Sequence, residues 1–170
     1  MEASSLNLLR ELSDSFGPSG FERETAGIVK REAQKYADEI TFDKLGSVIA
    51  RKRGTADTPK ILLAGHMDAR ARARDASMIP NQAFKQFVID TAEKEGIPYQ
   101  LSVVAAGGTD AGKFHVVKAG APAIVISVPT RHIHSHAGIA DLSDIDNAAK
   151  LVLALIRKLD GATVKGFTQV

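Results

Sequence analysis

The chain has 170 residues, 44% hydrophobic and 25% charged, a balance typical of a compact globular domain rather than a disordered or fibrous chain. Its 22 basic and 20 acidic residues leave a formal net charge of +2, so charge favours neither nucleic acid nor an acidic membrane as a partner. The absence of cysteine excludes disulfides and thiolate metal ligands. The N-terminus does not resemble a secretion leader and no apolar run approaches membrane-spanning length, so we expect a cytoplasmic protein with no membrane partner.

The first part of the chain predicts two helices separated by a turn. Serine often caps helices, and Ser5 could cap the first one. After it, three leucines recur at helical spacing: Leu6, Leu9 and Leu12. Turn-forming residues at positions 16–20 end this helix. A second helix is expected from Phe21 to Tyr36, and its buried face consists of Phe21, Ala26, Ile28, Val29 and Ala33.

Strand patterns follow these helices. Residues 39–42 and 47–50 are alternating segments joined through Leu45-Gly46, which predicts a hairpin. Residues 60–64 form a nearly continuous apolar run, which is typical of an interior strand buried on both faces.

The second half of the chain alternates predicted helices with predicted strands. A helix opens at Pro80-Asn81 and ends at Gly96, and a strand follows over residues 99–105. Gly107-Gly108 then leads into a helix that carries Phe114, Val116 and Val117, and residues 122–128 form a second buried strand.

The last predicted element is a long helix. Ser143 and Asp146 form a capping box for a helix that runs to about Leu159. Its inner face consists of Ile145, Ala149, Leu151, Val152 and Leu155. Strands that alternate with helices favour an α/β fold, a three-layer αβα sandwich with a mixed, mostly parallel sheet.

The segment between the two halves is unusual. Between Asp68 and Asp75, alanine and arginine alternate. One interpretation is a solvated linker. The other is a junction, at about residues 69–75, where a large insertion has been lost or removed. A nucleic-acid-binding segment would be more basic and would contain aromatic residues. We expect residues 1–170 to form a single domain.

Histidines follow two of the predicted strands. Gly65-His66-Met67-Asp68 comes directly after residues 60–64, at a strand end where ligands gather in open α/β sheets. Asp68 could orient His66 for metal binding. After the strand at 122–128, the residues His132, His134 and His136 would share one face if the chain were extended. The alternative is a solvated polar loop.

A glycine-rich loop forms a third candidate. Gly107 and Gly108 would let the backbone approach a ligand, and Thr109 or Asp110 would cap the following helix. An ordinary tight turn between a strand and a helix is an equally good interpretation. The loop lacks the Gly-Lys-Ser/Thr ending of a phosphate-binding loop.

Six motifs together resemble the tetrahedral (TET) aminopeptidases and occur in the same order over about residues 5–160. They are residues 16–22, 43–46, 65–68, 97–100, 107–112 and 131–135. The resemblance implies a zinc-exopeptidase-like sandwich that holds two Zn²⁺ or Co²⁺ ions, between which a water attacks the first peptide bond of a substrate. Some members were labelled endoglucanases, but no positioned carboxylate pair stands out here, so we do not expect glycoside hydrolysis.

The resemblance also implies roles for individual residues. By position, His66 is a ligand of one metal, Asp68 is its orienting partner in the catalytic site, and His134 is a ligand of the other metal. The family's bridging Asp, its Glu pair and its remaining Asp ligand have no match in this chain. In the family they lie, with an inserted dimerisation domain, between the positions of Asp68 and Asp75. We therefore expect one ion or none, and makeshift ligands could come from His132, His136 or Asp110.

Two functions remain open on this basis. The chain is either a metal-dependent aminopeptidase domain acting on short peptides, impaired or inactive at this length, or a non-catalytic fold remnant or engineered minimal domain that serves as an assembly scaffold. Family members form dodecamers through dimers of the inserted domain. Because that insertion is missing and sheet edges would be left unpaired, we expect a homo-oligomer, preferably a dimer.

Overall fold

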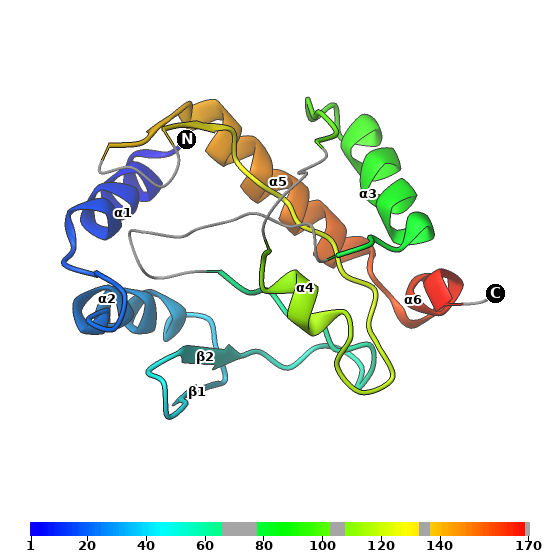
Figure 1. Ribbon diagram of the computed structural model, residues 1–170, viewed down its shortest axis with the longest axis horizontal. Helices are drawn as coiled ribbons and strands as arrows, with labels where there is room; N and C mark the ends of the chain where they lie inside the picture. The colour runs from blue at the N-terminus through cyan, green and yellow to red at the C-terminus, as the bar shows by residue number, and fades with distance from the viewer. Residues whose placement is uncertain (66–77, 103–107, 133–136, 169–170) are drawn as a thin grey trace. The chain divides into compact units, whose positions relative to one another are not determined.

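The structure is a computed structural model that describes residues 1–65, 78–102, 108–132 and 137–168 (Figure 1). The chain groups into two compact units. The first contains described residues 1–57 and 63–65, and the second contains residues 58–62 and the described residues from 78 onwards. None of the helices in the described ranges is both long and apolar enough to cross a membrane.

The first unit begins with a pair of helices, α1 (Ala3–Asp14) and α2 (Arg23–Ala33). The predicted cap at Ser5 is wrong, because Glu2 occupies the N-cap position and Ser5 lies within the first turn. Helix α2 is shorter than predicted and buries Ala26 and Ile28 as expected. Phe21 precedes the helix and is 69% exposed, so its predicted burial is wrong.

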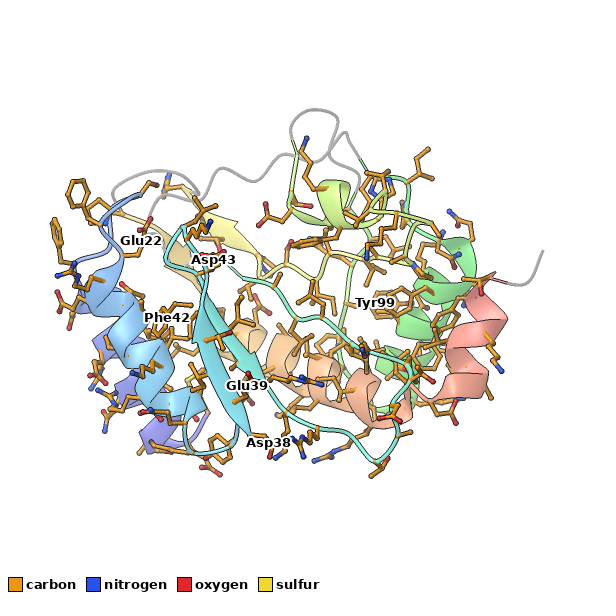
Figure 2. All side chains as sticks on the ribbon, turned by 90° about the horizontal axis from the view of Figure 1, so that it is seen from below. Glu22, Asp38, Glu39, Phe42, Asp43 and Tyr99 are labelled. Carbon is orange, nitrogen blue, oxygen red and sulfur yellow. The ribbon has the colours of Figure 1, made fainter. Side chains whose placement is uncertain are left out.

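The predicted hairpin of the first unit is confirmed. Strands β1 (Glu39–Phe42) and β2 (Val48–Arg51) are antiparallel, with Glu39 opposite Arg51 and Phe42 opposite Val48. Figure 2 shows Asp38 and Asp43 at opposite ends of β1. The Asp43 carboxylate accepts hydrogen bonds from the backbone N–H groups of Leu45 (2.8 Å) and Ser47 (2.9 Å), and Gly46 supplies the positive φ of 89° that closes the turn.

The second unit is built on two long helices, α3 (Gln82–Lys94) and α5 (Leu142–Lys158). Its buried apolar cluster consists of Val88, Ala92, Ile97, Leu151 and Leu155. Helix α6 (Gly161–Thr168), which the sequence did not predict, adds Phe167, whose ring stacks on that of Phe84 with centroids 5.0 Å apart.

The ends of α3 and α5 are defined by local contacts. The Asn81 side chain accepts a hydrogen bond from the Phe84 N–H at the start of α3, and Gly96, with a φ of 64°, follows its last turn as predicted. The predicted capping box at α5 is wrong: Asp141 is the N-cap, and its carboxylate accepts from the Ser143 N–H at 2.7 Å. Ala149, predicted to be buried, is exposed.

The remaining elements of the second unit are short. Helix α4 spans Ala111–Phe114, and the strands β3 (Thr130–Arg131) and β4 (Ile139–Ala140) pair antiparallel. The exposed Val116 and Val117 lie beyond α4, so the longer helix predicted there is wrong.

Two predicted interior strands are wrong. Residues 60–64 and 122–128 join no ladder with described residues, and Leu62 and Leu63 are 68% and 63% exposed. Residues 99–102, the described part of a third predicted strand, are not a strand either. An apolar run shows that a segment favours burial, but a strand also needs a hydrogen-bonding neighbour, and the local sequence does not identify one. Both ladders within the described ranges are antiparallel hairpins, and the three-layer, mostly parallel sheet stays a prediction.

The segment at residues 122–128 nevertheless packs on one side. Figure 1 shows it running alongside α5, and Ile124 and Ile126 contact the buried cluster of α3 and α5. Val125, between them, is 38% exposed. The segment therefore has the alternation of a strand without a neighbouring strand among the described residues.

Candidate functional site

Most of the predicted site lies outside the described residues. This applies to His66, Asp68, Gly107, His134 and His136. Their roles, and the expected proximity of His66 to His134, stay predictions.

The described part of the glycine-rich loop leads into α4. The Thr109 carbonyl accepts a hydrogen bond from the Gly112 N–H at 3.0 Å, and the Asp110 carbonyl accepts from Lys113 at 2.8 Å and Phe114 at 2.9 Å. Asp110 occupies the N-cap position, but its side chain makes no capping hydrogen bond. The predicted cap position at Asp110 is thus correct, but the predicted capping contact is wrong. The backbone of Asp110 is in the αR region, and it does not direct the side chain to the first turn as an extended N-cap does.

His132 directly follows β3. Its φ of 57° lies in the left-handed region, where His is one of the more tolerated residue types, and its side chain is exposed. It therefore lacks the extended backbone needed to share a face with His134 and His136. Strand β3 ends at Arg131, which pairs with Ile139 of β4. In the sequence, His134 and His136 lie between these two residues.

One half-buried histidine was not singled out by the motifs. His115 follows α4, and its Nδ1 lies 3.2 Å from the Ala111 carbonyl oxygen, one helical turn earlier. It lines an open depression of about 330 Å³ together with Asn81, Gly120 and Pro122. The only sequence signal for it was a helical spacing of four residues from Ala111, which does not distinguish a functional histidine from a structural one.

The donor set does not fit a dinuclear metal centre. A catalytic zinc ion takes about three protein ligands, whereas the sequence supplies two motif-matched imidazoles and one orienting carboxylate for two ions. Within the described ranges, no group of three or more His, Asp or Glu side chains is arranged to hold a metal ion. We therefore derive no catalytic step through a metal pair.

Comparison with known proteins identifies the relatives of this chain. Residues 69–151 match the M42 glutamyl aminopeptidase family. Residues 69–151 thus belong to the M42 aminopeptidases. This confirms the family resemblance, and the matched stretch begins directly after Asp68, at the predicted junction.

Two curated M42-type relatives illustrate the match. A putative aminopeptidase of Acetivibrio thermocellus is 38% identical over 85 residues, which is 50% of this chain and 26% of that protein. The glutamyl aminopeptidase of Lactococcus lactis is 37% identical over 83 residues, which is 49% of this chain and 22% of that protein. The chain thus spans about a quarter of the length of these curated relatives.

A solved structure resembles the whole chain. The TET aminopeptidase of a marine sediment archaeon of the Thaumarchaeota superimposes with a TM-score of 0.90, covering 97% of this chain and 100% of the solved one, at 24% sequence identity. At that identity the likeness establishes the fold. The chain therefore has a TET aminopeptidase fold.

Proposed function

We propose that this chain is a metal-dependent aminopeptidase-type domain directed at the N-termini of short peptides, and that it is impaired or inactive at its length of 170 residues. The match of residues 69–151 to the M42 family is the observation that carries the proposal. Both curated relatives described above are aminopeptidases by name. The two units are parts of one catalytic-type domain, with His66 and His134 at the carboxyl edge of a mostly parallel sheet between two helical layers.

The proposed impairment follows from the number of metal ligands. His66 and His134 hold at most one Zn²⁺ or Co²⁺, Asp68 orients His66, and His132, His136 or Asp110 would have to complete the coordination. In the wider family, one carboxylate bridges the two metal ions and another acts as the general base. The motifs of this chain contain no counterpart of either, so no general base is evident in the sequence.

The test is a peptidase assay on the purified 170-residue chain. Leucyl-, lysyl- and glutamyl-p-nitroanilides are incubated with the chain in Zn²⁺, in Co²⁺ and in EDTA, and we expect release at the EDTA background. Robust metal-dependent release would overturn the impairment. If such release is lost in His66→Ala and kept in His115→Ala, the site assignment is supported even though the impairment is not.

A non-catalytic role as an assembly scaffold is the second candidate. Its motivation is the number of large apolar side chains on the surface, including Leu62, Leu101 and Val116, which are 68%, 67% and 63% exposed. Surfaces of this kind recruit partners. We propose a homodimer rather than a dodecamer. Dialysis against Zn²⁺ followed by metal analysis tests the scaffold role: a chain that retains a stoichiometric ion keeps a partial metal site and contradicts a purely non-catalytic scaffold.

A further inference from the structure

Helix α6 is held against α3 by discrete contacts within the second unit, and Figure 1 shows the two helices side by side. The Phe167 ring lies against the rings of Phe84 and Phe87, with centroids 5.0 and 5.5 Å apart. The Asn81 side chain donates to the Phe167 carbonyl at 2.8 Å. Below, Asn81, Phe84 and Phe87 are together called the α6 seat.

Helix α6 has little stability of its own. It has eight residues, which include Gly161 and Gly166, and none of its residues is fully buried. A helix this short is at most marginally stable in water, and glycine weakens it further. The helix therefore depends on the α6 seat. It can leave the seat without breaking up the buried cluster of α3 and α5, because no residue of α6 belongs to that cluster.

The connection between α5 and α6 has the features of a hinge. It consists of Leu159 and Asp160. Leu159 departs from helical geometry, with φ −81° and ψ 88°, and the Asp160 carboxylate accepts from the Thr163 N–H at 2.8 Å, where α6 begins. With helical angles at both hinge residues, α5 would continue into α6 and carry Phe167 away from the α3 of its own chain. Short hinges favour exchange of the element that follows them between two copies.

The occupant that fits a vacated α6 seat is the α6 of a second copy. It brings the same ring and the same carbonyl, so each contact that is lost within a chain is regained between chains. The exchange is reciprocal, and both seats are filled about one twofold axis. A foreign peptide would instead compete with a helix that is tethered to the seat and therefore present at a high effective concentration.

We propose that two copies of this chain exchange α6, so that Phe167 of each copy occupies the α6 seat of the other. The inference rests on the homodimer proposed above and specifies its contact. It depends neither on peptidase activity nor on a bound metal.

Cross-linking of the isolated dimer tests the exchange on the full chain, and the absence of cysteine makes introduced thiols specific. Size-exclusion chromatography with light scattering identifies the fraction that has twice the mass of 18.1 kDa. Ile79→Cys combined with Thr168→Cys places two exposed thiols on one depression, one beside the α6 seat and one on α6. After reaction of the dimer fraction with a short bis-maleimide, we expect a covalent dimer on a denaturing gel.

The monomer fraction and a second cysteine pair are the controls. In the monomer fraction the same reagent should close the cross-link within one chain and leave a monomer band. Gln86→Cys with Asp90→Cys replaces two side chains that are hydrogen bonded at 2.8 Å within α3, so this pair should give a monomer band in both fractions. Phe167→Ala removes the ring that fills the α6 seat and should abolish the dimer.

The outcomes separate the exchange from the homodimer itself. A dimer in which the cysteines at positions 79 and 168 cross-link only within each chain would overturn the exchange while keeping the homodimer. The exchange is also wrong if Phe167→Ala, still folded by circular dichroism, remains as dimeric as the parent chain. A parent chain that stays monomeric at every concentration would overturn both.

Discussion

The two units differ in what holds their helices together. In the second unit, α3 and α5 share a buried cluster that includes Val88, Ala92, Leu151 and Leu155, and Ala92 is only 1% exposed. Phe84 and Phe87 extend this contact to Phe167 of α6, with ring centroids 5.0 and 5.5 Å apart. Removal of apolar surface from water stabilises this unit.

Polar contacts connect the helices of the first unit. Helix α1 contains no fully buried residue. The Ser15 and Thr25 hydroxyls lie 2.8 Å apart, and the Arg31 guanidinium binds both carboxylate oxygens of Glu11, at 2.7 and 2.6 Å. Exposed ion pairs contribute little to stability, so we expect α1 to separate from its neighbour more readily than α3 separates from α5.

The largest expected effect is the loss of a buried leucine from the second unit. Leu155, 5% exposed, belongs to the α3 and α5 cluster, and Leu155→Ala should lower the free energy of unfolding by about 2–4 kcal/mol, since it leaves a cavity. Urea unfolding followed by circular dichroism measures this. Leu153→Ala, at an exposed position of the same helix, should change stability by no more than about 0.5 kcal/mol. Equal costs at the two positions would contradict the assigned core.

A smaller effect is expected at the start of α3. The Asn81 side chain accepts from the Phe84 N–H at 2.9 Å and donates to the Phe167 carbonyl at 2.8 Å, so one residue caps α3 and attaches α6. Asn81→Ala should cost about 1–2 kcal/mol in the same unfolding measurement. Asn81→Asp keeps the acceptor and loses the donor, and its cost should lie between those of the parent chain and the alanine variant. If Asn81→Asp costs as much as Asn81→Ala, the cap contributes nothing.

Elements set by neighbouring residues could be predicted from the sequence. The hairpin of β1 and β2 follows from its alternation and from Gly46, and α3 follows from its capping residue Asn81 and from Gly96. Cap positions were less certain because Asp141 and Ser143, two residues apart, are both good capping types.

Elements set by distant contacts could not be predicted in this way. Helix α6 packs Phe167 against two rings of α3, a contact that its own two-glycine sequence does not indicate. Residues 60–64 and 122–128 have the composition of strands, yet strand formation depends on partners elsewhere in the chain. For the site, the ordered motifs were enough to predict the family, whereas the geometry of His66 and His134 stays a prediction.

The smallest expected effect concerns the ion pair between α1 and α2. The Arg31 side chain, by hydrogen bonding and then by charge, lowers the pKa of Glu11 below the usual glutamate range. A carboxylate with a lowered folded-state pKa stabilises the fold above the unfolded-state pKa, and this contribution disappears as the pH falls through the folded-state pKa. Both side chains are about half exposed, at 51% and 44%, so water and salt screen the pair and its contribution is small.

Glu11→Gln removes this contribution at every pH. At pH 7 and low salt the variant should melt slightly below the parent chain. The difference in Tm should shrink as the pH falls below the unfolded-state pKa of glutamate and through the lowered folded-state pKa of Glu11. Salt at about 1 M should reduce the difference at pH 7 in the same way. Asp14 lies in the same helix, and its carboxylate makes no ion pair with any of the described residues. Asp14→Asn should therefore show neither the pH dependence nor the salt dependence of the Tm difference. A Tm difference for Glu11→Gln that is as large as that for Leu155→Ala would mean that polar contacts hold the first unit as strongly as apolar burial holds the second.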